Sequence, residues 1–209
     1  MAGRVFLIAR DSPDPSADYD AKLDVMLSAR GCVPVFWLTL FGSTDACNRL
    51  VRRRKHDGSG MLVPVPGLFV DRRTALMRLC ERRGTIFRYI PAARALFDEF
   101  AGFMGAQYFS YVQLDTDGLG GPNNKEVVRV WLHSAVRAFE TEDPDDLRNV
   151  FEVQSLEFDP QTRRVLWDWT SPAPITDLCG HAGSPTVSFE RLAHRVSARD
   201  SWTASARVA

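Results

Sequence analysis

Cysteine is scarce in this sequence, with only four residues among 209. No two of them are separated by the two-residue gap that zinc knuckles and dithiol redox motifs require. Such sparse usage excludes a disulfide framework and is typical of reduced thiols in an intracellular protein. The four are Cys32, Cys47, Cys80 and Cys179.

Long hydrophobic runs are also lacking. The longest uncharged apolar run covers residues 32–41 and contains Pro34, whereas a membrane-spanning helix needs about 20 apolar residues. The apolar stretch near the N-terminus, residues 5–9, is shorter than the core of a secretory signal, which has roughly 7–15 residues. We therefore expect a cytoplasmic protein with no membrane partner.

The common catalytic motifs are missing as well. The glycines of residues 118–121 are not followed by the Gly-Lys-Ser/Thr of a phosphate loop, and no GxGxxG or HExxH pattern occurs. No serine lies in a GxSxG elbow. Cys179 and His181 supply only two of the three or four ligands that zinc needs. The sequence thus assigns no catalytic residue and no cofactor, and it leans away from an enzyme.

Net charge is absent in total but not locally. Twenty-six basic residues balance twenty-six acidic ones, yet residues 49–94 carry a net +9 and residues 95–160 a net −9. The two segments either pair with each other or form a bipolar surface for a charged partner. Nucleic acid is one candidate partner for the basic segment. The densest acidic cluster is a candidate binding patch for a basic partner and comprises Glu140, Glu142, Asp143, Asp145 and Asp146.

Apolar periodicity and capping residues predict helices that alternate with strands. We expect strands at residues 4–9, 61–65, 85–90 and 107–114, and helices at 18–30, 43–56, 71–83, 91–104, 123–139 and 143–151. Residues 33–41 fit either type. Asp159 begins a turn between residues 153–158 and 164–169, which predicts a β-hairpin.

The pattern as a whole predicts an α/β or α+β fold. We expect a single domain over residues 1–185, with a mixed central sheet, helices packed on it and the C-terminal β-hairpin. Residues 186–209 are expected to form a C-terminal helix and a weakly ordered tail.

Asp115 and Asp117 offer the best catalytic hypothesis. They follow a predicted strand and precede Gly118, so two carboxylates in one turn could share a divalent metal ion. Asp-x-Asp-Gly is also a common turn sequence, because Asp accepts tight turns and Gly accepts positive φ. The sequence is therefore compatible either with a metal site at Asp115 and Asp117 or with a turn that has no further function.

Trp167 and Trp169 lie on the same face of a predicted strand. They belong either to the core or to a protein interface, where tryptophan often anchors binding.

Two short segments carry a resemblance to a known class of proteins. VPVFWLTLFGSTD, residues 33–45, and YVQLDTDGLGG, residues 111–121, resemble segments of bacterial immunity proteins, which neutralise toxins delivered between neighbouring cells. The resemblance implies a small cytosolic protein without a reaction of its own, which binds one toxin domain tightly. It carries no binding residue over to a position of this sequence.

Three functional readings follow. The first is a protein-binding inhibitor whose partner is a cognate toxin domain, such as a nuclease with a basic active site facing the acidic patch. The second is a metal-dependent enzyme that uses Asp115 and Asp117. The third is a nucleic-acid-binding protein that uses the basic segment, residues 49–94.

Overall fold

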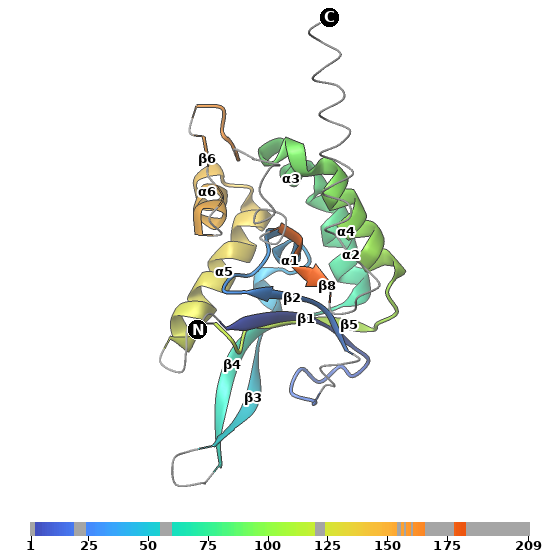
Figure 1. Cartoon of the computed structure of the whole chain (residues 1–209), viewed down its shortest axis with the longest axis vertical. Coiled ribbons are helices and arrows are strands. Elements are labelled where there is room, and N and C mark those ends of the chain that lie inside the picture. Colours follow the sequence, from blue (N-terminus) through green and yellow to red (C-terminus); the bar gives the residue numbers. More distant parts are fainter. Residues whose placement is uncertain are drawn as a thin grey trace, which may run out of the picture.

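A six-stranded sheet with helices packed against it makes up the body of the protein (Figure 1). The computed structural model describes residues 3–18, 24–54, 60–119, 124–153, 156, 158–159, 161–165 and 178–182. The strands are β1 (Arg4–Arg10), β2 (Val25–Arg30), β3 (Ala46–Arg54), β4 (Gly60–Asp71), β5 (Tyr111–Asp115), β6 (Phe158–Asp159), β7 (Arg164–Val165) and β8 (His181–Ala182). The helices are α1 (Val35–Leu38), α2 (Arg72–Glu81), α3 (Arg83–Tyr89), α4 (Arg94–Ala106), α5 (Lys125–Thr141) and α6 (Pro144–Val153), with short 3₁₀ turns η1 (Ser43–Asp45) and η2 (Pro91–Ala93).

The sheet order is β3-β4-β5-β1-β2-β8, and every described pairing is antiparallel. The predicted α+β fold is confirmed, and so is the C-terminal hairpin, as β6 and β7. The expected mixed sheet is corrected to an antiparallel one. A parallel pair needs a crossover between neighbouring strands. Here helices α2 to α4 connect β4 to β5 without such a crossover. The start of β5, Tyr111, lies beside the end of β4, Asp71, so the two strands run antiparallel.

Helix α1 lies at the centre of the core, and all four of its residues are fully buried. The ring of Phe36 packs edge-on against Phe97, with the ring centroids 5.0 Å apart. The Trp37 indole donates a hydrogen bond of 2.8 Å to the backbone carbonyl of Cys179. Gly180 has a φ of +73°, and a Cβ there would lie 2.5 Å from the Trp37 ring. Residues 33–41, which fitted either type of element, thus contain a short buried helix.

Three predicted elements are of the wrong type. The residues expected at the end of the helix over 18–30 form strand β2, and most of the helix expected over 43–56 is strand β3. Their pairing with β1 and β4 outweighs the local helix signals. The expected strand over 85–90 lies instead in α3. Its buried residues Thr85, Ile86 and Tyr89 follow helical spacing, so one face of a helix buries all three.

The remaining helices lie close to their predicted positions. Asp71 caps α2, because its carboxylate accepts a hydrogen bond of 3.0 Å from the backbone N–H of Thr74. In α5, Val127 and Val130 lie on the solvent side and are 66% and 54% exposed. The buried face of that helix consists of Val128, Leu132, Ala135, Val136, Ala138 and Phe139.

The apolar side chains of the sheet and of α1 to α6 join in one hydrophobic cluster. Within the described ranges, no helix combines the length and the apolar character that crossing a bilayer requires. Residues 186–209, expected as a helix and tail, lie outside the described part of the chain.

Candidate interaction surface

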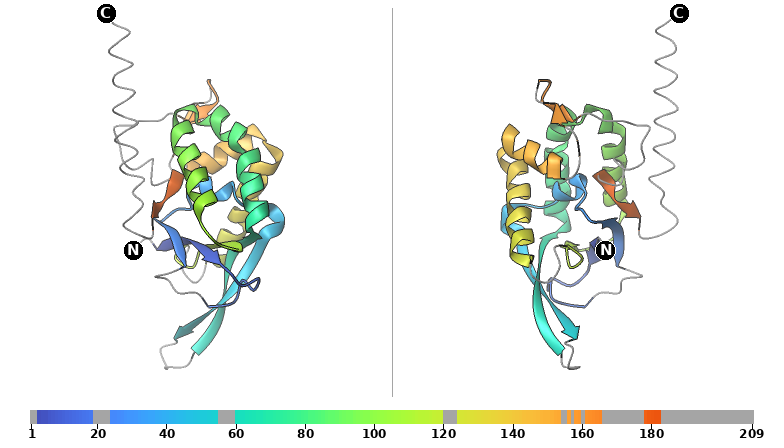
Figure 2. Two further views of the ribbon diagram at one scale, coloured as in Figure 1. Left: turned by 90° about the vertical axis from the view of Figure 1, so that its right-hand side faces the viewer. Right: turned by 60° about the vertical axis from the view of Figure 1, so that its left-hand side comes forward.

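Strands β3 and β4 form an arm that projects from the sheet, away from the helices (Figure 2). The two strands pair continuously from Ala46↔Leu68 to Arg54↔Gly60. β5 pairs with β4 only from Gly67 onward. The outer part of the arm is therefore a two-stranded ribbon, and we call residues 46–54 and 60–66 the β-arm.

The two edges of the β-arm differ in their backbone groups. The Thr116 hydroxyl donates a hydrogen bond to the carbonyl of Pro66, so the backbone carbonyl of Pro66 points away from β3. In an antiparallel pair, opposite residues either exchange both hydrogen bonds or neither. The backbone of Asn48, opposite Pro66, therefore also points outward, as does that of Leu50, opposite Pro64.

The outer edge of β3 thus presents N–H and C=O groups, and no strand pairs with it in the described part of the chain. The edge of β4 instead carries Pro64 and Pro66, which have no N–H to offer. Proline on an edge discourages pairing with a further strand. A strand from a partner protein could therefore pair with the outer edge of β3 but not with the edge of β4.

One face of the β-arm exposes aliphatic side chains. Leu50 is 51% exposed and Leu62 is 60% exposed. They share this face with Pro64, opposite Leu50, and with Arg52, opposite Leu62. An exposed aliphatic patch next to a positive charge is typical of a surface that binds another macromolecule. Sequence reasoning missed it, because residues 43–56 were predicted as a helix.

The predicted metal candidate Asp115 lies at the end of β5, next to the base of the β-arm. Its carboxylate accepts a 2.6 Å hydrogen bond from Arg49 and a 2.8 Å bond from the backbone N–H of Asp117. The Asp115 side chain is 1% exposed. A guanidinium thus occupies the position next to this carboxylate where a cation would bind, which favours a structural ion pair. Among the described residues, no group of three or more His, Cys, Asp or Glu side chains could hold a metal ion.

Asp117 belongs to the turn that follows β5. The Lys125 ammonium donates to its backbone carbonyl at 2.7 Å and lies 3.8 Å from its carboxylate. The next residue, Gly118, packs so closely on β1 that a Cβ there would lie 2.0 Å from the carbonyl oxygen of Arg4. This geometry supports the turn reading of Asp-x-Asp-Gly.

Two members of the acidic patch pair with the basic segment of the same chain. Glu140 accepts a 2.8 Å hydrogen bond from the backbone N–H of Ser43 and lies 3.9 Å from Arg82. Burial alone would raise the pKa of Glu140, but the Ser43 hydrogen bonds and nearby arginines lower it below its usual value. Glu142 accepts a hydrogen bond from the Thr85 hydroxyl and pairs with Arg88 at 3.3 Å. The oppositely charged segments therefore neutralise each other in part.

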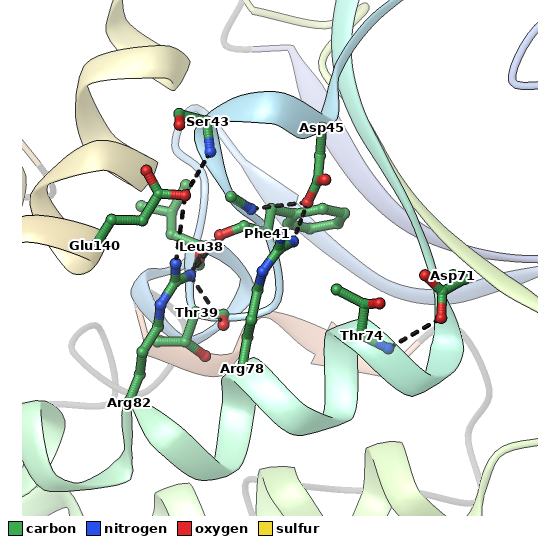
Figure 3. Close-up of polar contacts among 11 residues, drawn as sticks. Leu38, Thr39, Phe41, Ser43, Asp45, Asp71, Thr74, Arg78, Arg82 and Glu140 are labelled. Carbon is green, nitrogen blue, oxygen red and sulfur yellow. Dashed lines mark hydrogen bonds and ion pairs between the residues drawn. The ribbon is translucent and has the colours of Figure 1, made fainter.

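Arg82 is the centre of this internal network (Figure 3). Its buried guanidinium donates hydrogen bonds to the carbonyls of Leu38, Thr39 and Phe41, at 3.3 Å for Leu38 and 3.1 Å for Thr39. These carbonyls lie at the end of α1, where a helix leaves acceptors unsatisfied. Burial lowers the pKa of Arg82 to about 10, which leaves the side chain charged at neutral pH.

The other acidic residues lie at the start of α6. The carboxylate of Asp143 accepts hydrogen bonds from the backbone N–H groups of Asp145 and Asp146, at 2.9 and 3.1 Å. All three are exposed. Negative charges at the start of a helix stabilise it, because they face the positive end of the helix dipole. Of the five acidic residues, only Asp143, Asp145 and Asp146 are exposed and, within the described ranges, make no ion pair with the basic segment, and Asp143 caps α6. The predicted aromatic anchors Trp167 and Trp169 lie outside the described residues.

Comparisons of the chain with protein families, with curated proteins and with solved structures found no match.

Proposed function

We propose that the protein is a protein-binding inhibitor of the immunity class and that its target docks on the β-arm. The observation that carries the proposal is the pair Leu50 and Leu62, exposed on one face of a projecting ribbon. When a partner covers such aliphatic groups, their removal from water contributes roughly 25 cal/mol of favourable free energy per Å² of buried apolar surface. The resemblance of residues 33–45 and 111–121 to immunity proteins supports a toxin domain as the target.

The acidic patch is a weaker docking surface than the β-arm. Glu140 and Glu142 already accept hydrogen bonds within the chain, and a partner would have to compete with Arg82 and Arg88 for them. The β-arm has the opposite charge, with Arg52, Arg53, Arg54 and Lys55 in or next to β3. The target surface is therefore acidic rather than the basic active site of a nuclease. Such a partnership would operate in the cytoplasm.

The test is affinity capture from the native host at moderate salt with matched double variants. Leu50→Asp/Leu62→Asp places two negative charges on the β-arm. Val127→Asp/Val130→Asp does the same on the exposed face of α5 and serves as the control. We expect one stoichiometric protein partner with the wild type and the α5 variant, and none with the β-arm variant.

The captured partner is then co-expressed with each variant in a growth assay. The wild type and the α5 variant should relieve its toxicity, whereas the β-arm variant should not. Capture that is unaffected by the β-arm substitutions, or a captured protein that is harmless when expressed alone, refutes the proposal.

Nucleic acid is the second candidate partner, because a two-stranded ribbon fits the major groove of duplex DNA. The basic residues in and next to β3 would then contact phosphates, and the affinity would fall steeply with salt. At moderate salt, a protein partner that is captured by the wild type and lost in the β-arm variant supports the inhibitor, because nucleic-acid binding is weak under that condition. Duplex DNA bound only at low salt and lost with Arg52→Gln would favour this alternative.

A further inference from the structure

Residues of α3, of the start of α4 and of the β6–β7 hairpin line a cleft of about 600 Å³. Figure 1 shows α3 and β6 at the opposite end of the molecule from the tip of the β-arm. Three separate parts of the chain supply arginines to the cleft. Arg88 comes from α3, Arg94 begins α4, and Arg163 and Arg164 come from the β6–β7 hairpin. The cleft therefore brings the arginines of residues 88–94 together with those of the β6–β7 hairpin, about seventy residues later in the sequence.

Few of these charges are balanced locally. Arg88 pairs with Glu142 at 3.3 Å. Within the described ranges, Arg94, Arg163 and Arg164 form no ion pair with a carboxylate. Asp159 lies opposite Arg164 in the hairpin, but its carboxylate accepts hydrogen bonds from Gln161 and Thr162 in the turn. An anion bound in the cleft would therefore find arginines whose charges no carboxylate of the described residues already neutralises.

Two of the arginines have distinctive local surroundings, one in its backbone and one beside an aromatic ring. Arg163 has a φ of 54°, a left-handed conformation that residues other than glycine seldom adopt. The guanidinium of Arg94 lies over the ring of Phe87, 5.1 Å from its centroid. Such cation–π stacking holds the planar group in a defined orientation.

We propose that this cleft binds a phosphate-bearing ligand of mononucleotide size. Planar guanidinium groups match phosphate oxygens with paired hydrogen bonds, and arginine is the preferred residue for such recognition. The volume falls in the range of small-molecule sites, about 300–1,000 Å³. Phe87 and Tyr89 line the same cleft and supply an apolar wall beside the charges. The site is independent of the proposed β-arm interface.

The test is isothermal titration calorimetry on the full chain at low salt with adenosine triphosphate, inorganic pyrophosphate and adenosine. Both phosphate compounds should bind, whereas adenosine alone should not. The affinity for both should decrease as salt rises, because the arginines are solvent-exposed.

The key variant is Arg163→Gly/Arg164→Gln. Glycine suits the left-handed backbone at position 163, so the hairpin should keep its conformation while losing the charge. The control is Arg129→Gln/Arg148→Gln, which removes the same charge from exposed positions on α5 and α6. The cleft variant should bind pyrophosphate about tenfold or more weakly, and the control within about twofold of the wild type.

Three results would overturn the proposal. No measurable heat with either phosphate compound would exclude the ligand class. Equal loss of affinity in both double variants would show a general charge effect. A single-stranded oligonucleotide that binds more tightly than adenosine triphosphate, and is lost in the cleft variant, would assign the cleft to nucleic acid.

Discussion

Replacing Arg82 by methionine should destabilise the protein by about 4 kcal/mol. The substitution keeps an apolar side chain of similar length but removes the donor of three hydrogen bonds. The carbonyl of Leu38 retains the backbone N–H of Phe41 at 3.3 Å, whereas those of Thr39 and Phe41 lose this donor. Each buried acceptor left without a partner costs about 1–3 kcal/mol.

Urea unfolding followed by tryptophan fluorescence measures this loss, because Trp37 is fully buried in the core next to these carbonyls. The melting temperature should fall by about 8–16 °C, since 1 kcal/mol shifts it by about 2–4 °C in a chain of this size. Arg82→Lys should lie between methionine and the wild type, because it keeps the charge but not the planar fork.

The matched control is Arg83→Met, the same substitution one residue along the chain. The Arg83 side chain is 54% exposed and pairs with Asp98 at 2.9 Å. Such an exposed ion pair contributes about 1 kcal/mol or less. If Arg82→Met and Arg83→Met differ by less than about 1 kcal/mol, the reasoning that Arg82 anchors α1 is wrong.

Two further predictions concern a helix cap and the thiols. Asp71→Ala should destabilise the protein by about 1 kcal/mol at pH 7 in urea unfolding, because α2 loses its cap. Hydrogen bonds from Thr74 lower the pKa of Asp71 in the folded state, so this stability is present above the ordinary value of 3.8 and is lost as the pH falls below it. A gap between variant and wild type that did not narrow on acidification would contradict that account. In alkylation at pH 8 read by peptide mass spectrometry, exposed Cys80 should react before Cys47 and Cys179. Burial, followed by the charges of Asp115 and Asp45, raises the pKa of Cys47 to about 12, and burial raises that of Cys179. Faster labelling of Cys47 than of Cys80 would contradict this order.

Local signals predicted the elements whose formation is decided locally. The helix expected from residue 71 is α2, capped by Asp71, and the helix expected from residue 91 corresponds to the 3₁₀ turn η2, which begins at Pro91, followed by α4. A cap or a fixed φ acts within a few residues, so the local sequence reveals it. The β6–β7 hairpin follows from its turn sequence at Asp159 in the same way.

The β-arm could not be predicted by the same means. Its arginines favour a helix, and Ser43 is a good helix cap, so the local sequence points away from a strand. The strand expected over residues 61–65 stopped before Pro66, whereas β4 continues through Pro66 to Asp71. Both Pro64 and Pro66 lie inside β4, with their nitrogens facing away from β3. Only the register between β3 and β4 reveals this arrangement. The available signal was the spacing of the two prolines, which places them on one edge of a strand.

The order of the strands also governs when the protein can finish folding during its synthesis. Strand β1 pairs with β2 nearby, but its other neighbour, β5, emerges from the ribosome about a hundred residues later. The last described strand, β8, must then join β2, and the carbonyl of Cys179 must reach the indole of Trp37. Until that point the nascent chain leaves one side of its central tryptophan uncovered. The core of a newly made molecule therefore closes only after Cys179 and the residues of β8 have left the exit tunnel.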